Sequence, residues 1–154
     1  KRIASNKIIL IGGSQAGWII PEINTISDVW LSICISGPAV TVGEEIFYSD
    51  LAERGRYTQE EADKILSGFI GMHGYDPIKR IEKMKSPSLW IFGGKDVSIP
   101  VKKSMKLLDS AKTLKHLPLE MKLYPGADHG LYNNETHKRE AFVDAIVQWI
   151  NSQR

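Results

Sequence analysis

Four short segments of the chain carry the apolar patterns of β-strands. Residues 8–11, 30–36 and 88–92 are continuous apolar runs rich in β-branched and aromatic side chains, which is typical of parallel strands buried on both faces. Residues 119–124 instead alternate apolar and charged side chains. Because successive side chains of a strand point to opposite faces, this alternation predicts a strand with one exposed face at the edge of a sheet.

Helical patterns separate these strands. Residues 18–26 are predicted to form a helix in which Pro21 falls within the first two turns, where its missing N–H is tolerated. A second helix is predicted over residues 101–114 and a last one over residues 136–151. Strands that alternate with helices form a parallel sheet, so we predict an α/β three-layer sandwich in which helices flank a mainly parallel sheet of about four strands. The last helix would bury an apolar stripe made of Phe142, Ile146, Trp149 and Ile150.

The segment 39–85 has a different character, because charges, aromatics and glycines intermix and no strand pattern is present. Thr58 and Glu61 have the spacing of a capping box and predict the start of a helix that runs toward Phe69. Asp76-Pro77 predicts another helix start, with Ile78, Ile81 and Met84 along one face. We therefore predict a single domain over residues 1–154 with a mainly helical insertion at 39–85.

The composition is that of an ordinary globular protein, with 25% charged and 42% hydrophobic residues. The net charge of +2 is scattered and the apolar runs are short, so we expect neither a nucleic acid nor a membrane as partner. Cys34 is the only cysteine, which excludes an internal disulfide, and its apolar neighbours predict a buried strand residue. We expect no metal site, since no ligand spacing surrounds His73, His116 or His137.

A serine stands at the turn between the first strand and the first helix. Ser14 is preceded by Gly12 and Gly13 and followed two residues later by Ala16, with Gly17 next. A serine held at the apex of so sharp a turn adopts a strained backbone, and bulky side chains two residues before or after it would collide across the turn. The sequence therefore predicts a nucleophile elbow at Ser14.

The segment Gly12-Gly13-Ser14-Gln15-Ala16 resembles the Gly-x-Ser-x-Gly elbow of the α/β-hydrolase family, with alanine in the last place. Asp96 follows the third predicted strand in Gly-Gly-Lys-Asp, and His129 follows the fourth in Pro-Gly-Ala-Asp-His-Gly. Both loops resemble the acid and histidine loops of that family, and the order Ser, Asp, His is the family's order. The resemblance covers essentially the whole chain, which matches the C-terminal half of the family's fold. We therefore expect a truncated α/β-hydrolase fold.

The resemblance implies a role for each of these residues. Ser14 would attack a carbonyl carbon, His129 would take the serine proton, and Asp96 would fix the imidazole tautomer. The backbone N–H of Gln15 would stabilise the oxyanion, and no cofactor is implied. Asp128 stands beside His129 and is the alternative acid, although a role in stabilising its turn is favoured.

The expected function is a serine hydrolase that cleaves a carboxylic acyl bond of a small-molecule substrate, most simply an ester. The alternatives are a peptidase of the prolyl oligopeptidase-like type, because the elbow and histidine loop resemble those enzymes too, and a catalytically inert fragment that acts as an interaction module. A flavodoxin-like phosphate-binding domain would leave Asp96 and His129 unexplained. Aromatic residues are candidates for lining an acyl pocket, chiefly Trp18, Phe47 and Tyr48, with Phe69 and Tyr75 beside them.

The chain begins with Lys1 instead of Met, and residues 1–6 read as the end of a helix or the loop into the first strand. We therefore expect a C-terminal piece of a longer hydrolase that lacks the strands before the elbow and the second oxyanion N–H. The open edge of the first strand would then pair with a second copy of the chain, which gives a homodimer, or with the missing N-terminal half. The location is unknown and a cytoplasmic one is favoured; any signal peptide of the longer protein would lie in the missing N-terminal part.

Overall fold

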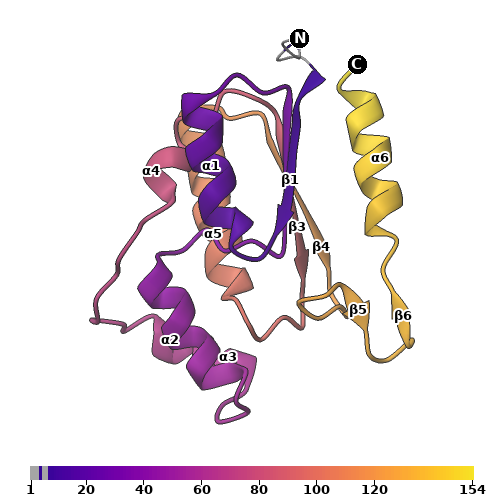
Figure 1. The fold of residues 1–154 in the computed structure, drawn as a ribbon. Coiled ribbons are helices and arrows are strands. Elements are labelled where there is room, and N and C mark those ends of the chain that lie inside the picture. The colour runs from indigo at the N-terminus through magenta and orange to yellow at the C-terminus, as the bar shows by residue number, and fades with distance from the viewer. Residues whose placement is uncertain (1–3, 5–6) are drawn as a thin grey trace.

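The sheet of the molecule has four parallel strands in the order β1-β2-β3-β4, so each strand pairs with its neighbour in sequence (Figure 1). The computed structural model describes residue 4 and residues 7–154, and the prediction for residues 1–6 lies outside this part except at Ala4. The predicted parallel strands are confirmed, and the alternating strand lies at an edge as expected. The strands are β1 (Ile9–Gly13), β2 (Leu31–Ile35), β3 (Ser88–Gly93) and β4 (Leu119–Tyr124).

Helices cover both faces of this sheet, which confirms the three-layer α/β arrangement (Figure 1). On one face Ile20, Ile81 and Leu108 pack with the strand residues Trp90 and Phe92. The other face packs against the last helix through apolar strand residues. The helices of the first face are α1 (Ala16–Ile26), α4 (Ile78–Ile81) and α5 (Val101–Lys115), and the helix of the second is α6 (Phe142–Ser152).

The last helix is shorter than predicted, and the prediction that it begins near Thr136 is wrong. A two-stranded hairpin of β5 (Tyr132–Asn133) and β6 (Lys138–Arg139) precedes it. The side chain of Asn133 accepts the N–H of Glu135 and Thr136 and so closes the hairpin turn, and His137 has a φ of 52°, which a continuing helix does not allow. The predicted stripe holds, since Ile146 and Trp149 are buried and Phe142 and Ile150 are half-buried.

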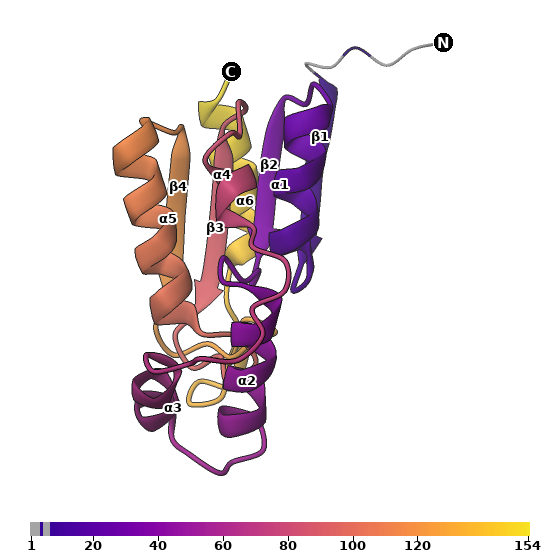
Figure 2. The same cartoon turned by 90° about the vertical axis from the view of Figure 1, so that its left-hand side faces the viewer.

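The connection between β2 and β3 is helical, and its first part, which holds the next two helices, lies beyond the carboxyl ends of the strands, before α4 returns to the face of the sheet (Figure 2). The predicted capping box is present: Thr58 Oγ1 accepts the N–H of Glu61, and the Glu61 carboxylate accepts the N–H of Thr58 at 2.9 Å. The helix that it starts, α3 (Gln59–Leu66), ends before Phe69. A second capping box at Thr41 and Glu44 starts α2 (Val42–Ala52), a helix that our sequence interpretation did not identify.

Candidate active site

Ser14 joins β1 to α1 in a left-handed backbone conformation, with a φ of 54°. Its N–H donates to the carbonyl of Ile35 at 2.9 Å, and its own carbonyl accepts the N–H of Gly17 at 3.0 Å. A Cβ on Gly12 would lie 2.7 Å from the Cβ of Ala16, so the turn has room only for small residues at these places. The side chain of Ser14 is exposed, as a nucleophile that must meet a substrate requires.

The first turn of α1 lies directly against the end of β2. A Cβ on Gly17 would stand 2.4 Å from the carbonyl oxygen of Pro38, so only glycine permits this approach. Gln15 is the N-cap of α1, and in the part of the chain that the structure describes its N–H has no backbone acceptor. A free N–H at a helix N-terminus attracts negative charge, so it is suited to an oxyanion.

Asp96 and His129 form a hydrogen-bonded pair at the same end of the sheet. His129 Nδ1 lies 2.8 Å from Asp96 Oδ2, and Asp96 is fully buried. The other carboxylate oxygen accepts the N–H of Ser98 at 2.8 Å and of Ile99 at 3.2 Å. Because an ionised carboxylate only accepts hydrogen bonds, the neutral imidazole carries its proton on Nδ1, and Nε2 is left free to accept one.

Asp128 has the turn role that was favoured for it. Its Oδ1 accepts the N–H of Gly130 at 2.8 Å and of Tyr132 at 3.0 Å, which closes the histidine loop on itself. Asp96, and not its neighbour in sequence, therefore carries the contact with the imidazole of His129.

The hydroxyl of Ser36, which the sequence interpretation did not identify, holds the histidine loop at the end of β2. Ser36, the residue after β2, donates from Oγ to the carbonyl of His129 at 2.8 Å. The preceding residue, Ile35, accepts the N–H of Ser14. The loop that follows β4 thus returns across the sheet edge to the end of β2, which is the strand next to the elbow. No hydrogen bond joins Ser14 to His129 within residues 7–154, so what the structure brings together directly is the Asp96–His129 pair.

Two glutamates that the sequence interpretation did not identify, Glu45 on α2 and Glu53 just after it, interact electrostatically with His129. Burial raises the pKa of Glu45, with repulsion from Glu53 and Asp96 adding to the rise and attraction by His129 opposing it. Glu53 accepts a hydrogen bond from Ser98 Oγ at 3.3 Å, beside the acid loop. The insertion therefore adds negative charge around the imidazole.

The hydrogen bond to Asp96 raises the pKa of His129; burial opposes this, and the charges of Asp96, Glu53 and Asp128 add to the rise. A protonated imidazole cannot take a proton from serine, so we expect kcat/KM for acyl transfer to increase with pH through the His129 pKa, which lies above the usual value of about 6.5. A pH–rate profile measures this. A limb centred below that value would contradict it.

The free energy of unfolding changes with pH in the opposite direction to the expected activity. Because the folded pKa of His129 lies above its unfolded value, the stability that the pair contributes is complete below about pH 6.5 and is lost as pH rises through the folded pKa. The pH at which His129 becomes a base is therefore the pH at which this contribution fades.

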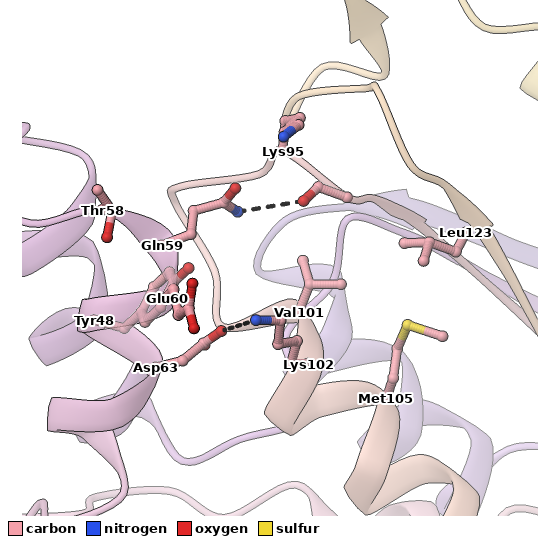
Figure 3. Close-up of a pocket in the computed structure, with 11 residues that line it drawn as sticks. Tyr48, Thr58, Gln59, Glu60, Asp63, Lys95, Val101, Lys102, Met105 and Leu123 are labelled. Atoms are coloured by element: carbon pink, nitrogen blue, oxygen red, sulfur yellow. Dashed lines mark hydrogen bonds and ion pairs between the residues drawn. The ribbon is translucent and has the colours of Figure 1, made fainter.

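The insertion also holds the acid loop from its other side. Gln59, on α3, donates from Nε2 to the carbonyl of Asp96 at 2.6 Å and lies 3.4 Å from the carbonyl of Gly94. Figure 3 shows Gln59 at the wall of a cavity of about 500 Å³ between α3 and the start of α5, with the Lys102–Asp63 ion pair at 3.2 Å. Gly94 and Lys95 of the acid loop line this cavity, whereas Ser14 and His129 do not.

The aromatic residues proposed to line an acyl pocket do not share one set of contacts. Tyr48 is buried in the core of the insertion and forms part of the wall of the cavity in Figure 3. Phe47 packs against Phe69 with ring centroids 5.0 Å apart. The indole N–H of Trp18 donates to the carbonyl of Val40 at 2.9 Å, and Tyr75 donates to Glu22 at 3.1 Å. The acyl pocket stays a prediction.

Cys34 is buried as expected, and burial raises the pKa of its thiol, so it is not a nucleophile at neutral pH. Within the described residues, no three or more His, Cys, Asp or Glu side chains are grouped so that they could hold a metal ion. In the same part of the chain, no helix has both the length and the apolar character needed to cross a membrane.

The α/β-hydrolases present their nucleophile at an elbow, which consists of a strand, a sharp turn with the nucleophile at positive φ, and a helix. Ser14 lies in such an elbow, and Asp96 and His129 follow later strands of the same sheet. The fold is therefore of the α/β-hydrolase class. The sequence profile of the Prolyl oligopeptidase family matches residues 1–153, and the chain belongs to this family. The resemblance drawn from the elbow and the two loops is thereby confirmed.

Among its relatives, the acylamino-acid-releasing enzyme of Arabidopsis thaliana is 24% identical over 156 residues, which cover 95% of this chain and 20% of that protein. The human enzyme of the same name is also 24% identical, over 96% of this chain and 21% of its own length. This chain thus spans about a fifth of these relatives.

Solved structures share the fold at low identity. An esterase of Pyrococcus furiosus has a TM-score of 0.63 with 14% identity, over 95% of this chain and 52% of its own. The acylaminoacyl peptidase of Pyrococcus horikoshii has a TM-score of 0.58 with 16% identity, over 83% of this chain and 20% of its own.

Proposed function

We propose that this chain carries the catalytic residues of a serine hydrolase that cleaves a carboxylic acyl bond, with Ser14 as nucleophile, His129 as general base and Asp96 as the acid that orients it. The observation that carries the proposal is the buried Asp96 at 2.8 Å from His129 Nδ1, with the histidine loop bonded to the end of β2 beside the Ser14 elbow. This arrangement supplies a nucleophile, a base and an orienting acid.

In the proposed reaction His129 Nε2 takes the Ser14 proton as Oγ bonds to the carbonyl carbon of the substrate. The negative charge that develops on the carbonyl oxygen is stabilised by the N–H of Gln15 at the start of α1. The imidazolium then gives its proton to the leaving group as the acyl bond breaks, which leaves Ser14 acylated. A water molecule then attacks the acyl carbon while His129 takes one of its protons, and the imidazolium returns this proton to Ser14 Oγ as the bond to the acyl group breaks, which releases the carboxylic acid and restores free Ser14.

Two substrate classes fit this chemistry. An ester is the simpler one, since its leaving group needs little help from an acid. A peptide with an acylated N-terminus is the second candidate, and the names of the relatives, acylamino-acid-releasing enzymes, favour it. Both reactions pass through the same acyl-enzyme at Ser14, so the choice depends on the leaving group and the binding pocket.

A matched substrate panel tests this proposal. We expect the chain to hydrolyse p-nitrophenyl esters, and we compare N-acetyl-alanine p-nitroanilide with alanine p-nitroanilide. Faster release from the acetylated amide identifies an acylaminoacyl peptidase, whereas turnover of esters alone identifies an esterase. The Ser14→Ala chain supplies the background. Rates equal to that background for every substrate would contradict the proposal and favour an inert interaction module.

We also propose that the free edge of β1 pairs with another strand, from the rest of a longer chain or from a second copy. In the part of the chain that the structure describes, β1 stands at the end of the strand order and pairs only with β2. Apolar side chains beside it are exposed: Ile11 on β1 by 58%, and Ile19 and Ile26 on α1 by 53% and 72%. An open edge flanked by apolar surface is a template for pairing. Such a partner would also be the source of the second oxyanion N–H, whose loss typically costs on the order of 100-fold or more in rate.

A further inference from the structure

Ser36 has three features that set it apart from an ordinary buried serine. It is only 2% exposed, its φ is 48°, and its Oγ donates to the carbonyl oxygen of His129 at 2.8 Å. Its N–H continues the ladder to β3 by donating to the carbonyl of Ile91 at 2.8 Å. The residue is therefore fixed in the sheet while its side chain holds a loop 93 residues away.

The bond to His129 lies where the histidine loop meets the elbow. Ile35 accepts the N–H of Ser14, and the next residue, Ser36, donates to the carbonyl of His129. Two successive residues at the end of β2 thus hold the backbone of Ser14 on one side and that of His129 on the other. A shift of this strand end would move the nucleophile and the base relative to each other.

Apart from the contact of the imidazole with Asp96, other hydrogen bonds hold the histidine loop on either side of His129. The carbonyl of Ala127 accepts the N–H of Lys95, and Asp128 bonds to Gly130 and Tyr132. These contacts fix the loop before and after the histidine. The carbonyl of His129 itself is held by the hydroxyl of Ser36.

The backbone strain at Ser36 supports a role for its hydroxyl. A side chain with a Cβ rarely adopts a positive φ, whereas glycine does so without steric cost. Glycine would relieve the strain but would leave the carbonyl of His129 without its donor. The strained serine supplies a hydrogen-bond donor to the carbonyl of His129 that an unstrained glycine could not.

We propose that Ser36 is a positioning residue: by holding the carbonyl of His129, it fixes the backbone from which the imidazole reaches Asp96 on one side and Ser14 on the other. The part of this inference that concerns Ser14 rests on the proposed function. The part that concerns the Asp96–His129 pair does not, because the 2.8 Å contact is a property of the folded chain.

The test uses Ser36→Ala and Ser36→Gly, neither of which keeps the hydroxyl. NMR titration of the His129 imidazole is expected to show a pKa that falls toward the ordinary value of about 6.5, because the contact with Asp96 loosens. Ester hydrolysis is expected to show kcat reduced by about 10- to 100-fold with KM unchanged, since small displacements of catalytic groups cost this much. Ser36→Gly relieves the backbone strain, so an equal loss in both variants assigns the effect to the hydroxyl.

Ser32 provides a matched control at the other end of β2. It is as buried as Ser36, and its Oγ accepts a hydrogen bond from Asn24 at 2.9 Å, far from the site. Ser32→Ala is expected to lower stability while it leaves the His129 pKa and kcat at their unmodified values. An unchanged His129 pKa in Ser36→Ala, or an equal fall in Ser32→Ala, would overturn the inference.

The two readouts separate this inference from the proposed function. If the unmodified chain hydrolyses none of the substrates and the His129 pKa still falls in Ser36→Ala, the proposed function fails and the positioning of His129 by Ser36 stands. If the unmodified chain hydrolyses esters and Ser36→Ala changes neither the pKa nor kcat, the positioning role fails and the proposed function stands.

Discussion

Ser14→Ala is expected to abolish covalent labelling by a fluorophosphonate and to reduce kcat by at least about 10⁴-fold, because no other group in the triad scheme can form the acyl-enzyme. The unmodified chain should gain one adduct, which intact mass and peptide mapping would locate on Ser14. The left-handed turn at Ser14 leaves room for alanine, so folding should be preserved, and circular dichroism checks this.

Ser110, an exposed serine on α5 whose hydroxyl bonds only to the carbonyl of Lys106, is the matched control for this experiment. Ser110→Ala should label like the unmodified chain. Labelling that persists in Ser14→Ala would place the nucleophile elsewhere, and labelling lost equally in both variants would point to a general effect on the fold.

Asp96→Asn is the second large effect, with an expected loss in kcat of about 10⁴-fold. Asparagine keeps the shape and can still accept the N–H groups of Ser98 and Ile99. Its amide, however, donates toward His129 Nδ1 where the carboxylate accepts, so the imidazole is driven to the tautomer that carries its proton on Nε2 and cannot act as base. The His129 pKa should fall as well, since its largest raising contribution is removed.

Asp128→Asn separates the two candidate acids. Asp128 uses one oxygen to accept the turn N–H groups of Gly130 and Tyr132, and asparagine can do the same. We therefore expect kcat to stay within a few-fold of the unmodified value. A loss in Asp128→Asn comparable to that in Asp96→Asn would reopen the choice of acid.

The sheet was predictable because burial on both faces leaves a plain signal in sequence. Continuous apolar runs predicted β1, β2 and β3, which are buried on both faces. The alternating run predicted β4 and also its position at the edge of the sheet. The placement of Ser14, Asp96 and His129 at one end followed, since the carboxyl ends of parallel strands share an edge.

What escaped prediction depends on contacts between segments far apart in sequence. The hydroxyl of Ser36 reaches a carbonyl 93 residues away, and Glu45 approaches His129 only after the insertion folds over the sheet edge. The hairpin before α6 replaced only the first residues of the predicted helix, because its turn is closed by the side chain of Asn133. By contrast, the box of Thr41 and Glu44 has the same spacing as that of Thr58 and Glu61, so α2 carried a local signal that was available in the sequence.

The long connection between β2 and β3 bears on how such a chain can change over evolution. It carries residues 36–87, about three times as many as the link between β1 and β2. The entropy of loop closure grows only with the logarithm of length, at about 0.6 kcal/mol for each doubling, so this connection costs about 1 kcal/mol more to close than the shorter link. Helices in this connection can therefore be lengthened, shortened or exchanged at small thermodynamic cost, while the strand ends that carry Ser14, Asp96 and His129 stay where the sheet holds them.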